Sequence, residues 1–156
     1  MNYFLSDDIA VIRLQEPVTY TDCLRPICLA RRPVDVLVDT MCLASEWGLV
    51  PTGQVNIYKL PNNLQKVKVP IVDKAKCTRT YNSFIDQNKI CAGWPHNGKG
   101  ACKGDSGGPL ACVIEKRWVM VGCASFGSGS CPVPDKPIVY SYLPNYYDWI
   151  DKVRKS

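Results

Sequence analysis

The sequence contains a single histidine, His96, among 156 residues, and only three phenylalanines and three methionines. One histidine cannot build a histidine-rich metal centre, and no cysteine pair has the C-x-x-C spacing typical of zinc sites. No apolar run reaches the roughly 20 residues of a membrane span. A glycine-rich phosphate-binding loop, an internal repeat and a low-complexity linker are also missing. We therefore expect no metal, no other cofactor and no membrane span.

Basic residues exceed acidic ones, with 19 lysines and arginines against 14 aspartates and glutamates, for a net charge of +5. The compact basic clusters are Arg31-Arg32 and the C-terminal group of Lys152, Arg154 and Lys155. The other charges are scattered rather than arranged in a stripe that could follow a nucleic-acid backbone. Nucleic-acid binding is therefore not predicted.

Nine cysteines in a chain of this length indicate an oxidising compartment. Because their number is odd, they cannot all pair within the chain. The first residues, Met1–Leu5, are too few and too uncharged to be a recognisable signal peptide. A secreted, extracellular location is therefore inferred from the cysteine content and not from a leader sequence.

Residues 104–109 read Gly-Asp-Ser-Gly-Gly-Pro and place a serine in a glycine-rich turn. A serine hydroxyl is a poor nucleophile until a base removes its proton, and the oxyanion that forms needs hydrogen-bond donors already in place. Gly104 and its neighbouring glycines let backbone N–H groups approach a substrate closely, and Asp105 can fix the turn from behind. The motif therefore predicts Ser106 as a nucleophile. A glycine-rich hairpin turn without chemistry is the simpler alternative.

The stretch Ala101–Leu110 resembles the nucleophile loop of the trypsin/chymotrypsin family of serine proteases. Further segments resemble that family in the same chain order: Asp8–Leu14, Arg25–Leu29, Trp47-Gly48, Ile90–Gly93, Ser125–Gly127 and Pro137–Tyr140. The resemblance implies an all-β fold of two antiparallel β-barrels, an active site in the cleft between them and a C-terminal α-helix. It also implies a secreted serine endopeptidase that works through an acyl-enzyme and needs no cofactor.

The length suggests that one barrel is incomplete, because all-β barrels often need roughly 200–250 residues in one unit. Residues 1–30 are expected to be a remnant of the first barrel and the connection between barrels. Residues 31–143 should form the complete second barrel with the nucleophile loop, and residues 144–156 the C-terminal helix.

The resemblance assigns Ser106 as the nucleophile, Asp8 as the aspartate that orients the catalytic histidine, and the N–H groups of Gly104 and Ser106 as the oxyanion hole. The family order is histidine, aspartate, serine, and no histidine precedes Asp8 in this sequence. The catalytic histidine is therefore predicted to be absent from these residues. His96 lies in an expected surface loop near the specificity pocket and is not predicted to be the base, which must reach the nucleophile within about 2.6–3.2 Å.

Activation in this family inserts a newly cleaved N-terminus beside the aspartate that precedes the nucleophile, which is Asp105 in this sequence. The segment Met1–Phe4 does not resemble a cleaved activation site. When a buried carboxylate loses its charged partner, the folded protein is destabilised by about 3–5 kcal/mol. We therefore expect the turn around Gly104 to have the loosely ordered arrangement of an inactive precursor.

The substrate pocket is assigned by resemblance to Gly100, Lys103, Ser125, Phe126, Gly127 and Ile138. Gly100 is expected at the floor, Ile138 should shorten that floor, and Gly127 leaves the entrance open. No carboxylate is among these residues, so a buried basic side chain of a substrate would stay unpaired. Medium apolar side chains such as leucine or valine are therefore predicted to fit. Lys103 either attracts an acidic group near the cleft or is a solvated surface residue.

The resemblance also implies three disulfides, Cys42–Cys112, Cys77–Cys91 and Cys102–Cys131. Cys28 resembles the family cysteine that links the catalytic domain to an upstream segment. Cys23 and Cys123 depart from the family pattern, and they either bridge each other or remain buried thiols.

Strands are predicted where apolar residues alternate and β-branched residues are frequent, at Ile9–Leu14, Gln65–Val72, Trp118–Phe126 and Ile138–Leu143. A terminal helix is predicted after Pro144, with Tyr147, Ile150 and Val153 on an apolar face that packs on the barrel. The strands that would cover the first of these segments are missing from the sequence.

Two functions remain in competition. The first is a serine endopeptidase domain that acts on polypeptides and is blocked by protein inhibitors, present as a partial chain that is inactive alone. The second is an inactive homologue that binds peptides or proteins through its second barrel. The complete motif around Ser106 and the presence of Asp8 favour the first.

Overall fold

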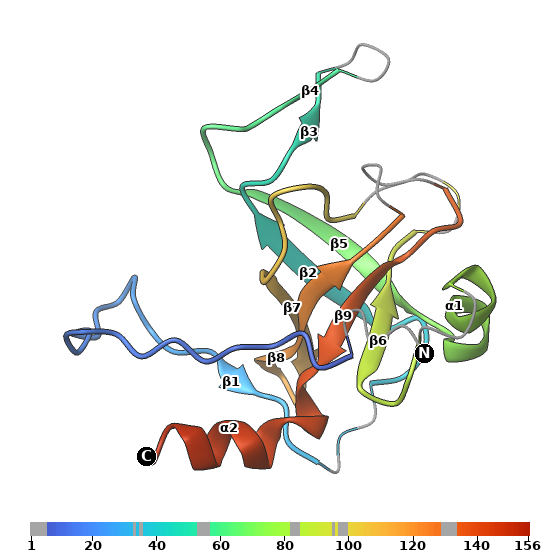
Figure 1. Ribbon diagram of the computed structural model, residues 1–156. Helices are drawn as coiled ribbons and strands as arrows, with labels where there is room; N and C mark the ends of the chain where they lie inside the picture. Colours follow the sequence, from blue (N-terminus) through green and yellow to red (C-terminus); the bar gives the residue numbers. More distant parts are fainter. Residues whose placement is uncertain are drawn as a thin grey trace.

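The structure is a computed structural model that describes residues 6–32, 34, 36–52, 57–81, 85–94, 96, 100–128 and 134–156 (Figure 1). Six antiparallel strands form a closed barrel: β2 (Met41–Glu46), β5 (Gln65–Val72), β6 (Lys89–Ala92), β7 (Pro109–Ile114), β8 (Arg117–Phe126) and β9 (Ile138–Tyr142). They are hydrogen-bonded in the order β8-β7-β2-β5-β6-β9, and β9 pairs again with β8 to close the barrel. The expected all-β class with one complete barrel is confirmed.

The strands follow the pattern of a sheet with one buried face. In β2, Cys42 and Ala44 are buried and Met41 is exposed, which is the two-residue period of a half-buried strand. Strands β7 and β8 are joined by the two-residue turn Glu115-Lys116, in which both residues have positive φ angles of 49° and 62°. This backbone conformation matches the twist of the paired strands, so the hairpin is tight.

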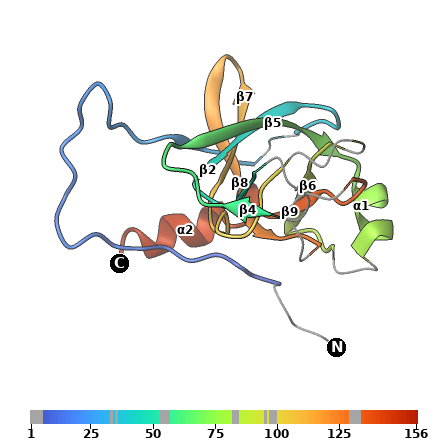
Figure 2. The same cartoon turned by 90° about the horizontal axis from the view of Figure 1, so that it is seen from above.

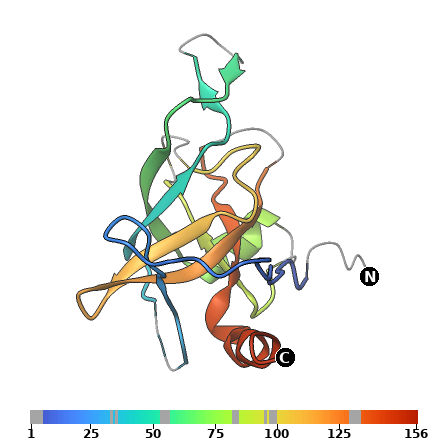
Figure 3. The same cartoon turned by 90° about the vertical axis from the view of Figure 1, so that its left-hand side faces the viewer.

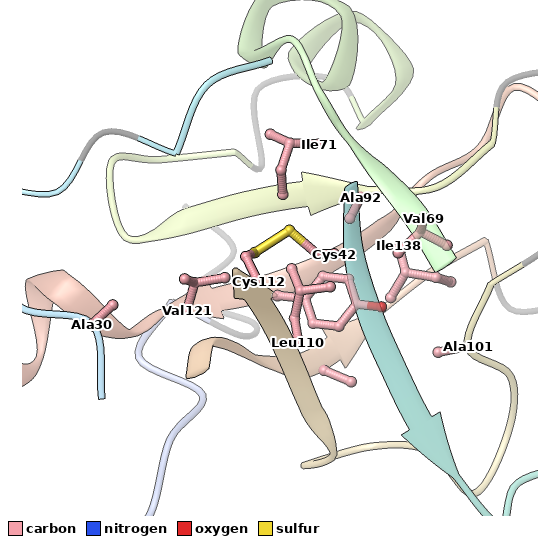
Figure 4. Close-up of a cluster of buried hydrophobic side chains, with 12 residues drawn as sticks. Ala30, Cys42, Val69, Ile71, Ala92, Ala101, Leu110, Cys112, Val121 and Ile138 are labelled. Atoms are coloured by element: carbon pink, nitrogen blue, oxygen red, sulfur yellow. A yellow bond between two sulfur atoms is a disulfide. The ribbon is translucent and has the colours of Figure 1, made fainter. Parts of the chain in front are cut away.

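The barrel core surrounds the disulfide between Cys42 and Cys112, which joins the paired strands β2 and β7 (Figure 4). Leu110, Val69 and Val121 pack around it and have no solvent exposure. Burying one such side chain stabilises the fold by about 1.5–3 kcal/mol. The second barrel therefore has a packed core of its own.

The described residues form six further elements outside the barrel: β1 (Cys28–Leu29), β3 (Val50–Pro51), β4 (Tyr58–Lys59), α1 (Lys74–Tyr81), the 3₁₀ turn η1 (Leu143–Asn145) and α2 (Tyr147–Val153). Strand β1 pairs in parallel with β8, outside the closed barrel. The β3–β4 hairpin extends from one end of the barrel and α2 lies at the other (Figures 1 and 3). Asp73 begins α1 by accepting a 3.0 Å hydrogen bond from the N–H of Lys76.

The predicted helix 144–156 is shorter in the structure, because a 3₁₀ turn precedes it. Leu143 and Pro144 are buried in that turn, and the N–H of Tyr146 donates to the Leu143 carbonyl at 2.9 Å before α2 begins. The predicted apolar face of α2 is half-buried. The guanidinium of Arg31 lies 5.1 Å from the ring centroid of Tyr147, which ties the segment after β1 to the helix.

Residues 6–27, which we call the N-terminal arm, form an extended segment outside the closed barrel (Figures 1 and 2). The strand predicted at Ile9–Leu14 is wrong, because these residues form no strand. Ile12 is 84% exposed and Leu14 61% exposed. A strand is stabilised by a neighbour that accepts its backbone hydrogen bonds and covers one face, and the described residues place no such neighbour beside the arm.

Two predicted disulfides are confirmed, Cys42–Cys112 and Cys77–Cys91. Cys102 is disulfide-bonded, and its predicted partner Cys131 lies outside the described residues. Cys23, Cys28 and Cys123 are free thiols. Both alternatives for Cys23 are wrong: Cys23 is neither bridged to Cys123 nor buried, but is an exposed thiol on the segment before β1. Cys123 is a half-buried thiol.

Candidate active site

The turn that carries Ser106 is shaped by two glycines with positive φ angles, 95° at Gly104 and 84° at Gly107. Other residues rarely adopt these angles, so glycine is needed at both positions. The N–H of Gly107 donates to the Ala124 carbonyl of β8 at 2.8 Å, which holds the turn against the barrel. The Ser106 side chain is exposed as a result.

Some backbone N–H groups of the turn are used in hydrogen bonds within the protein and others are free. The N–H of Asp105 donates to the Cys102 carbonyl, and the N–H of Gly108 donates to the Asp105 carbonyl, both at 3.1 Å. Within the described part of the chain, the N–H groups of Gly104 and Ser106 donate to no protein acceptor. These two are the predicted oxyanion-hole donors, and both are available to a substrate oxygen.

The side chain of Asp105 fixes the turn from inside the protein. Its residue is only 6% exposed, and its carboxylate accepts hydrogen bonds of 2.6 Å from the N–H groups of Gly48 and Cys102. A Cβ atom at Gly48 would lie 2.1 Å from Asp105 Oδ1, so the contact requires glycine at that position. The predicted structural role of this carboxylate thus has a physical basis, with backbone amides as its partners.

A second carboxyl group, that of Glu46 at the end of β2, lies near Asp105 and was missed by the sequence reasoning. Burial, followed by the negative charge of Asp105, raises the pKa of Glu46 from 4.5 to about 7. Its Oε1 atom is buried and has no hydrogen-bond partner among the described residues. The sequence has no local signal for this property, because the raised pKa depends on burial and on Asp105 elsewhere in the fold.

Asp8 is held at the barrel by two serine hydroxyls from different strands. Ser125 Oγ donates to Asp8 Oδ2 and Ser141 Oγ donates to the Asp8 carbonyl, each at 2.6 Å. Cys123 lies close by, and burial together with the charge of Asp8 raises the pKa of its thiol. The arm is therefore attached to the barrel at Asp8.

A pocket of about 160 Å³ opens beside Ser106. It contains most of the residues expected to bind substrate: Lys103, Ser125, Phe126, Gly127 and Ile138. A Cβ atom on Gly127 would lie 2.8 Å from Ile138 Cδ1, so the Ile138 side chain packs directly against the Gly127 backbone. Asp8 does not line this pocket, but it is hydrogen-bonded to Ser125, which does.

Two residues from the sequence analysis lie elsewhere. Gly100, expected at the floor of this pocket, instead lines a neighbouring pocket of about 250 Å³ together with Glu46 and Asp105. His96 is exposed and lines neither pocket. Of the described residues, no group of three or more histidine, cysteine, aspartate or glutamate side chains could hold a metal ion, and no helix is long and apolar enough to cross a bilayer.

The closed six-stranded barrel with a terminal helix defines a chymotrypsin-like protein. Residues 1–150 match the family model described as Trypsin, and the chain belongs to the trypsin family of serine proteases. Bovine (Bos taurus) coagulation factor XI is 40% identical over 144 residues, which cover 92% of this chain and 22% of that protein. The solved structure of neuropsin, described as a serine protease expressed in the limbic system of mouse brain, matches with a TM-score of 0.80 and 37% identity.

That match covers 91% of this chain and 59% of the neuropsin chain. The sequence thus spans about a fifth of the factor XI length and somewhat more than half of the neuropsin structure. By family the chain is a serine hydrolase.

Proposed function

We propose that this chain is the part of a secreted serine endopeptidase that carries the nucleophile, the orienting aspartate and the substrate pocket. Ser106 attacks the scissile carbonyl, and the N–H groups of Gly104 and Ser106 stabilise the oxyanion. Asp8 orients a histidine that residues outside this sequence supply. The observation that carries the proposal is the pair of 2.6 Å hydrogen bonds that hold Asp8 beside the pocket of Ser106.

Residues 1–30 act as the connection to the first barrel, in this proposal. The exposed apolar side chains of the arm, among them Ile12 and Leu14, suit a surface that further strands cover. Cys28 is a free, exposed thiol in β1, next to a groove between β1 and α2, and it can form a disulfide with an upstream segment. The second barrel and the terminal helix then correspond to residues 31–143 and 144–156.

The pocket favours an apolar side chain on the substrate. Among the described residues that line it, Asp105 has the one carboxylate, and that residue is only 6% exposed, with both oxygens bonded to backbone N–H groups. A substrate lysine or arginine would therefore meet no exposed carboxylate in the pocket. We expect the pocket of about 160 Å³ to take a side chain the size of leucine or valine.

The alternative is a binding module without catalysis, and the exposed position of the only histidine favours it. Sequencing the transcript upstream of the Met1 codon distinguishes the two proposals. An in-frame segment with a cysteine-flanked histidine supports the protease, whereas an in-frame stop codon without a start site further upstream supports the binding module.

Activity is then tested with a serine-directed fluorophosphonate probe and a peptide library. The longer form should be labelled at Ser106, and Ser106→Ala should abolish both labelling and cleavage. We expect the 156-residue chain to be at least about 10³-fold slower, because it lacks the base. Labelling of the short chain at the rate of the long form would contradict the need for an additional histidine.

A further inference from the structure

The pocket next to the nucleophile turn contains two carboxyl groups that differ in their hydrogen bonding. Asp105 and Glu46 both line this space of about 250 Å³, and Asp105 also lines the pocket of Ser106. The Asp105 carboxylate is satisfied by two backbone N–H groups. Glu46 has a buried Oε1 atom that makes no hydrogen bond within the described residues. Burial without hydrogen-bond partners disfavours the ionised form of a carboxyl group.

Glu46 also touches the nucleophile turn at Gly108. A Cβ atom on Gly108 would lie 1.1 Å from Glu46 Oε1 and 2.4 Å from Oε2, so the carboxyl group lies directly against the Gly108 backbone. Asp105 precedes Ser106 by one residue and Gly108 follows it by two. A change in the charge of Glu46 therefore acts on both flanks of the nucleophile.

The other titratable groups around Glu46 do not neutralise it. Tyr140 of β9 is 1% exposed with an unpaired hydroxyl, and burial, then the charges of Glu46 and Asp105, raise its pKa. Lys66 of β5 and Tyr58 of β4 line the same pocket, and both are exposed. Among the described residues no lysine or arginine forms an ion pair with Glu46. Asp105 is the charged group that raises the pKa of Glu46.

We propose that Glu46 is a positioning residue for Ser106: when neutral it packs against Gly108 and keeps the turn ordered, and when ionised it repels the Asp105 carboxylate and loosens the turn. Because the pKa of Glu46 is raised to about 7, the neutral form predominates in mildly acidic solution and the ionised form in mildly alkaline solution. Order in the turn is therefore lost as pH rises through that value. The proposal rests on the proposed function only in taking Ser106 as the nucleophile.

Hydrogen exchange of the 156-residue chain tests the proposal without any substrate. The amides of Asp105, Gly107 and Gly108 are hydrogen-bonded and report on opening of the turn. After correction for intrinsic exchange, their opening in the unchanged chain should increase about tenfold or more between pH values of about 5.5 and 8.5. Glu46→Gln, which stays neutral, should abolish the increase. Glu115→Gln, at an exposed glutamate in the β7–β8 turn, should retain it.

A direct titration keeps the test decisive if the glutamine variant does not fold. The ¹³C resonance of the Glu46 carboxyl group is followed in the unchanged chain over the same pH range. A midpoint near 7, accompanied by shifts of the Gly108 amide, supports the proposal. A midpoint near the ordinary value of 4.5, or an exchange increase that persists in Glu46→Gln, overturns it. Neither result depends on hydrolysis, so failure here is distinct from failure of the proposed protease.

Discussion

The hydroxyl of Ser125 donates a hydrogen bond of 2.6 Å to the carboxylate of Asp8, which lies 117 positions earlier in the chain. Ser125 also lines the pocket of Ser106. The bond therefore brings the candidate orienting aspartate to the edge of the candidate nucleophile's pocket. It also attaches the otherwise exposed N-terminal arm to the barrel.

The first prediction concerns this contact. A double-mutant cycle with Asp8→Ala and Ser125→Ala should give a coupling free energy of about 1 kcal/mol in urea unfolding, because a hydrogen bond to a charged group is stronger than one between neutral groups. Ser141 bonds the Asp8 carbonyl and is unaffected by either change. The exposed pair Arg25–Asp22 on the same arm is the control, with a coupling near zero. Equal coupling in both cycles would show that the Ser125 contact is no stronger than an exposed ion pair.

The all-β fold class could be predicted from the sequence, because the family motifs and the alternation of apolar residues both indicated strands. Strand β5 has its predicted bounds, Gln65–Val72, since its alternating residues lie between turn residues and Asp73. Strands β2 and β7 were missed, because their alanines and cysteines give a weak β signal even though they fill the core. The β7–β8 turn was missed because Glu115 and Lys116 adopt positive φ angles that sequence rules assign to glycine and asparagine.

The sequence indicates the candidate site only where a single motif contains its residues. Ser106, Gly104 and Asp105 lie together in the sequence, whereas the Asp8–Ser125 bond joins distant segments that only the closed barrel brings together. Glu46 could not be assigned a role, because its raised pKa depends on burial and on Asp105 across the fold. Long-range packing, and not residue type, decides such features.

The second prediction compares the two disulfides. Replacing Cys42 and Cys112 with alanine removes a link between residues 70 positions apart, and about 4 kcal/mol of stability should be lost. Replacing Cys77 and Cys91, 14 positions apart, should cost about 3 kcal/mol, because the closed loop is shorter. Urea unfolding of the two double variants measures both values. A larger loss at Cys77–Cys91 would contradict the predicted order.

The third prediction is the pH dependence of stability due to Glu46. Its pKa is about 7 in the folded chain and 4.5 in the unfolded chain, so the folded state holds the proton longer. Stability therefore falls as pH rises from about 4.5 to 7 and stays low above that. Because part of the side chain faces solvent, Glu46→Gln should stabilise by only about 1–2 kcal/mol at pH near 8, and by nothing at pH near 4. Denaturant midpoints at the two pH values check this, and a gain that is equal at both would refute the linkage.

The fourth prediction concerns the pocket in the active, longer form. Ile138→Ala removes the side chain that faces Gly127 and enlarges the space beside Ser106. The ratio of kcat/KM for phenylalanine over valine before the scissile bond should rise about tenfold or more, since even one methylene group in an apolar pocket changes such a ratio by about 10–200-fold. Val113→Ala, on the exposed part of β7, should leave the ratio unchanged. An unchanged ratio in Ile138→Ala would show that this residue does not limit the pocket.

The fifth prediction uses the two tyrosine hydroxyls with opposite surroundings. The hydroxyl of Tyr140 is buried without a hydrogen-bond partner in the described residues, so Tyr140→Phe removes an unsatisfied polar group. We expect the free energy of unfolding to stay constant or to rise by about 0.5–1 kcal/mol. The hydroxyl of Tyr146 donates to Asp7 at 2.9 Å, so Tyr146→Phe should lower that free energy by about 1 kcal/mol. Unfolding in urea at one pH compares them. If Tyr140→Phe is the more damaging change, the Tyr140 hydroxyl has a partner in solution, and the charge balance around Glu46 must include it.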